Sequence, residues 1–236
     1  MTGTTRRWIP LLLLIGAWPL GARAESPRNV MVELKFGPFR PDVDREFSSK
    51  TPWADAFGQT QFLMTQLELD WEVFTKAGVI ALGGTIGYSR AKGHSRLPDG
   101  EKSEDSTSFH VMPMSLSLIY RFDWAAHRYN IPLVPVAKGG IDGWFWWATN
   151  GVGQVSRSKD GVAGRGATFG GHATVGLMFL LDVLAQGMAR TFDNELGVNN
   201  TYLFAEYGWY WIDDFGASKS IDLSYRNFLA GIAFEF

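Results

Sequence analysis

The chain has 236 residues, with 22 Lys and Arg against 24 Asp and Glu, which leaves a formal net charge of -2. This balance argues against nucleic acid as a partner, and the absence of cysteine excludes a disulfide framework, thiol catalysis and cysteine-based metal sites. Aromatic residues make up 14% of the chain although its mean hydropathy is only -0.06. This combination fits a transmembrane barrel, in which half of each strand faces lipid and half a polar lumen.

The first 24 residues have the three-part layout of a secretory signal. Arg6 and Arg7 precede an apolar stretch over residues 8–20, and the small-residue pattern Ala22-Arg23-Ala24 follows. This stretch is interrupted by two prolines and a glycine and is shorter than the roughly 20 residues of a spanning helix, which disfavours an N-terminal anchor. We expect a signal peptide over 1–24, cleaved near Ala24, and one domain over 25–236.

Eight segments of alternating polarity follow the signal. In the clearest, FLMTQLELDWEVF at residues 62–74, apolar residues alternate with four polar residues at a strict spacing of two. That spacing is incompatible with one face of a helix, so the segment is predicted to be a strand with one polar side. The others cover residues 29–37, 79–89, 109–122, 133–147, 167–181, 202–212 and 227–236.

The connections between these segments differ in length in a regular way. Residues 39–61, 89–107, 149–166 and 213–221 form long connections, whereas residues 75–78 and 123–130 form short ones. Long loops on one side and short turns on the other are typical of bacterial outer-membrane barrels, with the long loops extracellular and both termini periplasmic. Between the sixth and seventh segments, Leu184, Met188, Phe192 and Leu196 recur every four residues, which predicts a short periplasmic amphipathic helix between Asp182 and Gly197.

The predicted fold is therefore all-β: an eight-stranded antiparallel transmembrane β-barrel with one short periplasmic amphipathic helix. Aromatic residues near both strand ends predict two girdles at the membrane interfaces. The periplasmic girdle is expected to include Tyr202, and the extracellular girdle to include Phe145 and Trp147. A soluble secreted sandwich is the alternative for these aromatics.

One parity of the strands collects polar and ionisable side chains that should face the lumen. An eight-stranded barrel is only wide enough to be filled by side chains, so we expect a network of salt bridges. An acidic path for cations is the alternative, because acidic residues are in excess. The residues of this network are Glu33, Lys35, Glu68, Asp70, Glu72, Arg121, Lys138, Asp142, His172, Glu206 and Glu235.

Ser108 and His110 share the lipid-facing parity near the extracellular rim. A serine nucleophile needs a base within hydrogen-bond reach, so this pair is the candidate for a lipid-modifying hydrolase. Neighbours on one face of a strand lie about 7 Å apart, and no acid is clearly placed to orient the histidine, which argues against catalysis.

The chain resembles a family of small outer-membrane β-barrel proteins known mainly from myxobacteria. The resemblance is carried by MVELKFGPFRPDVD from Met31, LMTQLELDW from Leu63, IPLVPVAKGGIDGWFWW from Ile131, ARTFDNELGVNNTYLFAEY from Ala189 and the terminal LAGIAFEF. It covers essentially the whole mature chain. It implies an outer-membrane location and a barrel fold, and it brings no activity, ligand or catalytic residues. The aromatic residues Phe234 and Phe236 resemble the signal that the barrel-assembly machinery recognises.

The expected function is that of an outer-membrane barrel with a structural or surface-interaction role and a filled lumen. A conduit for small or hydrophobic solutes and a hydrolase at the outer rim remain alternatives. The expected partners are outer-membrane lipid, lipopolysaccharide and the barrel-assembly machinery, and the expected state is a monomer. The sequence indicates no cofactor and no metal site.

Overall fold

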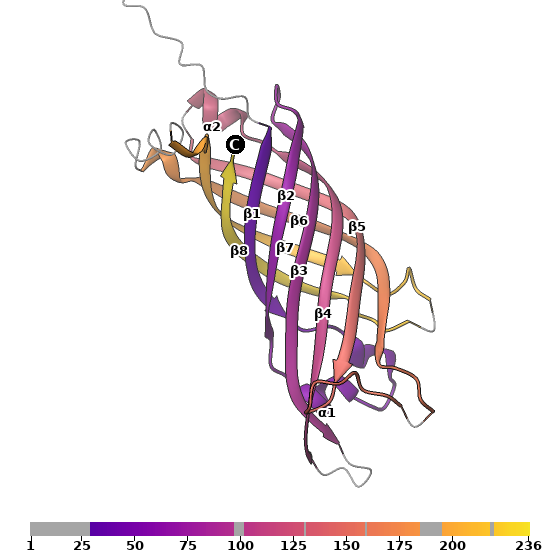
Figure 1. Ribbon diagram of the computed structural model, residues 1–236. Helices are drawn as coiled ribbons and strands as arrows, with labels where there is room; N and C mark the ends of the chain where they lie inside the picture. Colours follow the sequence, from indigo (N-terminus) through magenta and orange to yellow (C-terminus); the bar gives the residue numbers. More distant parts are fainter. Residues whose placement is uncertain (1–28, 97–101, 130, 159, 185–194, 218–219) are drawn as a thin grey trace, which may run out of the picture.

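The computed structural model describes residues 29–96, 102–129, 131–158, 160–184, 195–217 and 220–236. Eight antiparallel strands form a closed barrel in chain order, so the predicted fold class is confirmed (Figure 1). The predicted signal peptide lies outside the described residues and stays a prediction. The strands are β1 (Val30–Phe39), β2 (Phe62–Phe74), β3 (Val79–Arg96), β4 (Lys102–Arg121), β5 (Leu133–Thr149), β6 (Arg165–Leu180), β7 (Asn200–Trp211) and β8 (Tyr225–Glu235).

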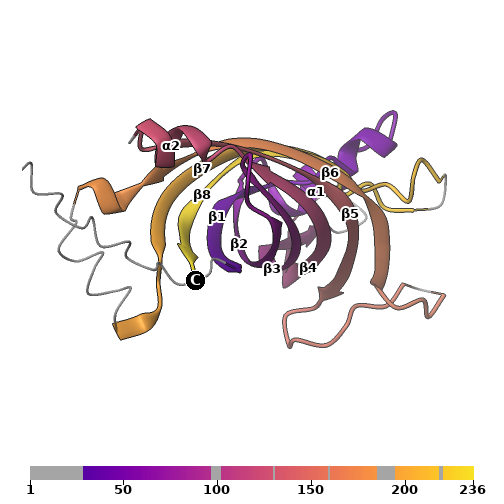
Figure 2. The same ribbon diagram turned by 90° about the horizontal axis from the view of Figure 1, so that it is seen from above.

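The barrel closes between β1 and β8. Leu34 lies opposite Ile232 in this pairing, and the backbone N–H of Phe236 donates to the carbonyl of Val30 at 2.8 Å. Closure matters because the unpaired backbone groups of a free strand edge have no partners in lipid. The strands curve around one common interior, with α2 (Trp124–Tyr129) beside one end of the barrel (Figure 2).

The outer face of the barrel is a belt of exposed apolar side chains. Along β4 the exposed residues Met114, Leu116, Leu118 and Tyr120 alternate with inward-facing ones. From Met112 to Phe122 the strand advances ten residues, and at about 3.4 Å per residue and a tilt of about 40° this height is roughly 26 Å. That matches the apolar band of a transmembrane barrel, about 25 Å tall. The architecture is therefore that of a transmembrane β-barrel.

Two of the long connections contain regular structure that the sequence did not indicate. Residues 89–107 were predicted as a loop, but most of them extend β3 and β4, which pair as far as Arg96 and Lys102. This part of the hairpin lies beyond the apolar belt, where the outward face of a strand meets water and carries polar residues such as Lys92, so the apolar alternation that marks a strand in sequence is lost. The projecting hairpin is visible at the lower end of Figure 1.

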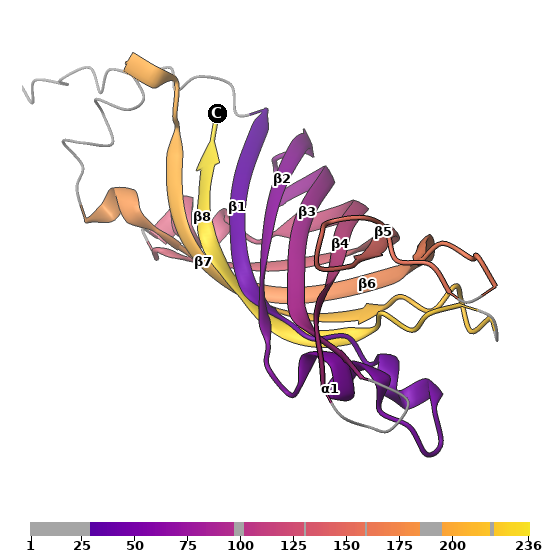
Figure 3. The same ribbon diagram turned by 60° about the horizontal axis from the view of Figure 1, so that its bottom comes forward.

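The connection 40–61 folds into η1 (Val43–Glu46) and α1 (Pro52–Phe57) and covers the same end of the barrel (Figure 3). Trp53 is 3% exposed and packs against Phe57 and Phe109, with ring centroids 4.6 and 5.3 Å away. Asp44 accepts hydrogen bonds from the backbone N–H groups of Trp53 and Ala54 at 2.7 and 3.1 Å, which holds η1 against α1. We call residues 40–61 the cap.

At the opposite end, α2 occupies the connection that was predicted as a short turn. After β6 the chain makes the short turn η2 (Leu181–Val183). The amphipathic helix predicted between Asp182 and Gly197 falls mostly on residues 185–194, outside the described residues. None of the helices in the described ranges has the length and apolarity needed to cross a membrane.

Candidate functional site: the charged interior and the extracellular rim

The interior of the barrel has an apolar cluster at the cap end, a charged group around Lys138, and a second apolar cluster toward the opposite end, where it lies beside the charged group around Arg121. All eleven residues assigned to the lumen from their parity are at most 8% exposed. The layer at the cap end contains Phe39, Trp144, Tyr210 and Tyr225, and the opposite layer contains Met31, Ile119, Met178, Tyr202 and Phe204.

These apolar layers correct part of the sequence interpretation. Tyr202 was assigned to the periplasmic girdle, yet it is 2% exposed and points inward. Trp144, the first residue of the aromatic cluster on β5, is 0% exposed and points inward too. Both lie on the same parity as charged residues of their own strands, Glu206 and Asp142 respectively. The face of the strand on which a residue lies therefore predicted its burial better than its distance from the strand end did. That distance gives only the height of a side chain in the barrel, whereas the face decides between lumen and lipid.

Lys138 joins opposite walls of the barrel. Its strand, β5, is four strands away from β1 in either direction around the closed sheet. The Lys138 ammonium donates to Glu33 on β1 and to Glu68 on β2 at 2.6 Å each, and lies 2.9 Å from Glu206 on β7. Lys35 reinforces the arrangement by donating to Glu68 at 2.8 Å. The Lys138 side chain thus links β5 to β1, β2 and β7 across the centre of the lumen.

Arg121 organises a second group of carboxylates, nearer to the β4 end that leads into α2. Its guanidinium donates to Glu72 and lies 3.8 Å from Asp70 and 3.6 Å from Glu235. Glu235 also accepts a hydrogen bond from the amide of Asn200. Arginine suits this position because its several donors reach carboxylates on different strands, here β2 and β8.

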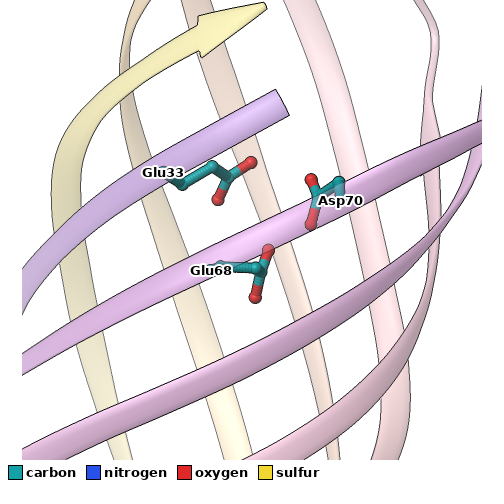
Figure 4. A group of neighbouring side chains, drawn as sticks. All are labelled: Glu33, Glu68 and Asp70. Atoms are coloured by element: carbon teal, nitrogen blue, oxygen red, sulfur yellow. The ribbon is translucent and has the colours of Figure 1, made fainter. Parts of the chain in front are cut away.

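Carboxylates outnumber cations in this layer. Six carboxylates face the three cations Lys35, Arg121 and Lys138, and both carboxylate oxygens of Asp70 lack a hydrogen-bond partner among the described residues. Glu33, Glu68 and Asp70 place one oxygen each within 4.8 Å of one another (Figure 4). The Lys138 ammonium, however, already bonds two of these three groups, Glu33 and Glu68, so a cation of the protein itself occupies the position between them.

A separate hydrogen-bonded chain lies beside the charged layer. The hydroxyl of Ser117 is 3.1 Å from Nε2 of His172, and Nδ1 of His172 is 2.8 Å from Asp142, which also accepts a hydrogen bond from Ser115. These contacts follow the order of a Ser-His-Asp triad. Sequence reasoning did not connect them because the three residues come from β4, β6 and β5. Ser117 is buried, and the interior cavity beside His172 measures about 10 Å³, room for about one water molecule, which leaves no space there for a substrate.

Ser108 and His110 are not brought together as a catalytic pair. The hydroxyl of Ser108 accepts a hydrogen bond from Arg90 at 3.0 Å, whereas His110 contacts Tyr88 at 2.7 Å and Thr149 at 3.2 Å. The partners of His110 within the described residues include no carboxylate. Its imidazole stacks on Trp147 with a centroid distance of 5.0 Å and an interplanar angle of 1°. The pair therefore belongs to a surface network of the rim.

A shallow apolar hollow of about 650 Å³ lies on the outer face over β3 to β6. Leu116, Ile141 and Phe169 line it, while Ser115 and Asp142 lie at its floor. Ser115 and Asp142 are directly paired across β4 and β5, and the register is continuous from Ser108 to Arg121. β4 and β5 thus leave no lateral gap between them at this hollow.

At its end of the barrel the cap is joined to the connection between β7 and β8. Arg45 donates to Asp222 at 2.8 Å, and this hydrogen bond raises the pKa of Arg45. Glu46 accepts a hydrogen bond from the backbone N–H of Asp222. The two connections come from opposite ends of the sequence, so their contacts fix the cap over the neighbouring loop.

No protein-family model matches the chain, and no curated protein matches it either. Several solved structures are similar over 89% of this chain. They include the attachment invasion locus protein Ail of Yersinia pestis, solved in complex with the heparin analogue sucrose octasulfate, with 11% identity, 97% of that chain covered and a TM-score of 0.44. Neisserial surface protein A has 13% identity, 98% coverage and a TM-score of 0.48. The outer membrane protein OprG from Pseudomonas aeruginosa has 10% identity, 96% coverage and a TM-score of 0.49.

Proposed function

We propose that this protein is an outer-membrane β-barrel whose role is exercised at its extracellular surface and whose interior is a structural core. The observation that carries the proposal is Lys138, which bonds carboxylates on opposite walls between two apolar layers. A filled interior leaves the cap, the projecting hairpin and the rim as the surfaces on which a partner can act. Outer-membrane lipid, lipopolysaccharide and the barrel-assembly machinery are the partners that such a location supplies, and we propose a monomer.

The location is supported by the apolar belt around a closed sheet and by the predicted signal peptide. Membership of the small outer-membrane barrel family known from myxobacteria remains part of this proposal. Sedimentation of cell membranes on a sucrose gradient tests the location. We expect the protein in the outer-membrane fraction, and recovery with the inner membrane would contradict the proposal.

The filled interior is tested by planar-bilayer recording with refolded protein. We expect no discrete conductance steps, because an ion would have to displace the Lys138 ammonium and cross two apolar layers. Lys138→Ala removes the central contact and serves as the comparison in the same bilayers. Reproducible steps from the wild-type protein would support the alternative of a conduit and overturn this part of the proposal.

A further inference from the structure

A row of outward-facing side chains crosses four strands at the edge of the apolar belt nearer the cap. Arg90 on β3 lies opposite His110 on β4, His110 lies opposite Trp147 on β5, and Trp147 lies opposite Arg165 on β6. The next row toward the hairpin tip contains Lys92, opposite Ser108. We call these six residues the rim row.

The cations of the rim row have no acidic partners of their own. Arg90, Lys92 and Arg165 are exposed, and no ion pair between described residues includes any of them. The polar contact of Arg90 is with the hydroxyl of Ser108 at 3.0 Å. Three uncompensated cations on one face therefore form a surface that complements an anion.

The rim row is also held in place. His110 is fixed by Tyr88 and Thr149 on either side and stacked on Trp147, so the centre of the row is a rigid flat surface between the cations. Neighbouring strands are about 4.8 Å apart, so Arg90 and Arg165, three strands apart, are separated by about 14 Å. Such a row suits a headgroup that carries more than one anionic group across a flat body.

The height of the rim row in the membrane indicates which class of ligand it meets. The apolar belt on β4 ends at Met112, and His110 is the next outward residue, where the headgroups of the outer leaflet meet a transmembrane barrel. Phosphate is the anionic group that arginine binds by paired hydrogen bonds at such an interface, and lysine binds it as a point charge. We infer that the rim row binds the phosphorylated headgroup of an outer-leaflet glycolipid; this inference rests on the proposed outer-membrane location.

The experiment compares lipid adducts on detergent-solubilised, folded protein by native mass spectrometry. The probes are lipid A, the same lipid A after phosphatase treatment, and phosphatidylcholine. The test variant is Arg90→Gln/Lys92→Gln/Arg165→Gln. The control is Lys50→Gln/Lys76→Gln/Arg128→Gln, which removes the same charge from exposed positions away from the row.

We expect wild type and control to bind phosphorylated lipid A equally and the test variant to bind it at least about tenfold more weakly, since charge-assisted hydrogen bonds are lost. Dephosphorylated lipid A should bind all three proteins as weakly as the test variant binds lipid A. Equal binding of the phosphorylated and dephosphorylated forms, or equal binding by both triple variants, would overturn the inference. Full displacement of lipid A by inorganic phosphate would do so too, because the row would then recognise phosphate alone.

Heat-modifiable migration verifies that each variant is folded before binding is compared. Sucrose-gradient fractionation is run on the same variants. A test variant that stays in the outer membrane and retains lipid A binding contradicts the rim row and leaves the proposed location intact. Wild-type protein recovered in the inner membrane contradicts the location, whatever the binding in detergent.

Discussion

At the scale of single residues, Lys138 is the side chain on which the charged layer depends most. It contacts three carboxylates, and its removal leaves them buried without a compensating charge. Lys138→Met is therefore expected to destabilise the folded barrel by about 3–5 kcal/mol. The midpoint of urea unfolding for refolded protein, followed by tryptophan fluorescence, measures this change.

Asp70→Asn is the matched comparison in the same layer. Neither oxygen of Asp70 has a hydrogen-bond partner among the described residues, and its ion pair with Arg121 is long, at 3.8 Å. Because carboxylates are in excess, loss of this charge should cost about 1 kcal/mol or less. Equal destabilisation by the two substitutions would show that the balance of charge described for the interior is wrong.

Ser117 provides a second test at this scale. Its contacts with His172 follow the order of a hydrolase triad, but the serine is buried and the cavity beside His172 measures only about 10 Å³. We expect a fluorophosphonate probe to leave Ser117 of the folded protein unlabelled. Labelling of the wild type that disappears in Ser117→Ala would instead establish a reactive serine and revive the hydrolase alternative.

The strand period explains how much of the site could be predicted from residues alone. A period of two assigns a side chain to one face, and this placed Glu33, Lys138 and the other ionisable residues correctly inside the barrel. It could not say which cation meets which carboxylate, because Lys138 and Glu33 are 105 positions apart and meet only after closure. The contacts of Ser117 with His172 and of His172 with Asp142 were missed for the same reason.

At the scale of elements, the packing of the cap against the projecting hairpin depends on the close approach of α1 to Gly93 on β3. A Cβ atom on Gly93 of β3 would collide with the backbone oxygen of Ala56 in α1. Gly93→Ala should therefore push α1 away from β3 at a cost of about 1–3 kcal/mol, the usual range for overpacking. Limited trypsin digestion at Arg45 and Lys50 should become faster while the barrel stays folded.

Gly84→Ala in the same strand is the control, because a Cβ atom at Gly84 meets nothing within 4 Å. It adds the same methyl group to β3 without touching the cap. Identical cleavage rates for the two variants would mean that α1 does not rest on Gly93.

The cap is an element that could not be predicted from the sequence. Strands that carry one wet and one lipid-facing side are marked by alternation, and these were found. The cap has no such signal, because its short helix is stabilised by burial of Trp53 against Phe57 and Phe109 more than by its own propensity. The contact of Trp53 with Phe109 cannot be inferred before β4 has been placed beside the cap.

At the scale of the whole molecule, the seam between β1 and β8 completes the barrel. Phe234 and Phe236 lie on the outward parity of β8, and the backbone of Phe236 pairs with Val30. Their role as an assembly signal stays a prediction from sequence. Phe236→Asp should reduce the amount of folded, heat-modifiable protein in the outer membrane several-fold.

Phe47→Asp is the control for this substitution. Phe47 is 44% exposed in the cap, outside the strands, so the same chemical change there leaves the seam untouched. Normal folded yield of Phe236→Asp beside normal yield of Phe47→Asp would contradict the assembly role.

The sequence by itself determined the number of strands, their faces and the identity of the side chains in the lumen. It could do so because lipid on one side and a filled interior on the other impose a period of two that is visible locally. The tertiary structure decided the apolar clusters and charged groups of the interior, the central position of Lys138, the cap over the barrel end and the cationic row at the rim. Each of these depends on register and closure between distant segments, which set heights and partners that no local pattern records.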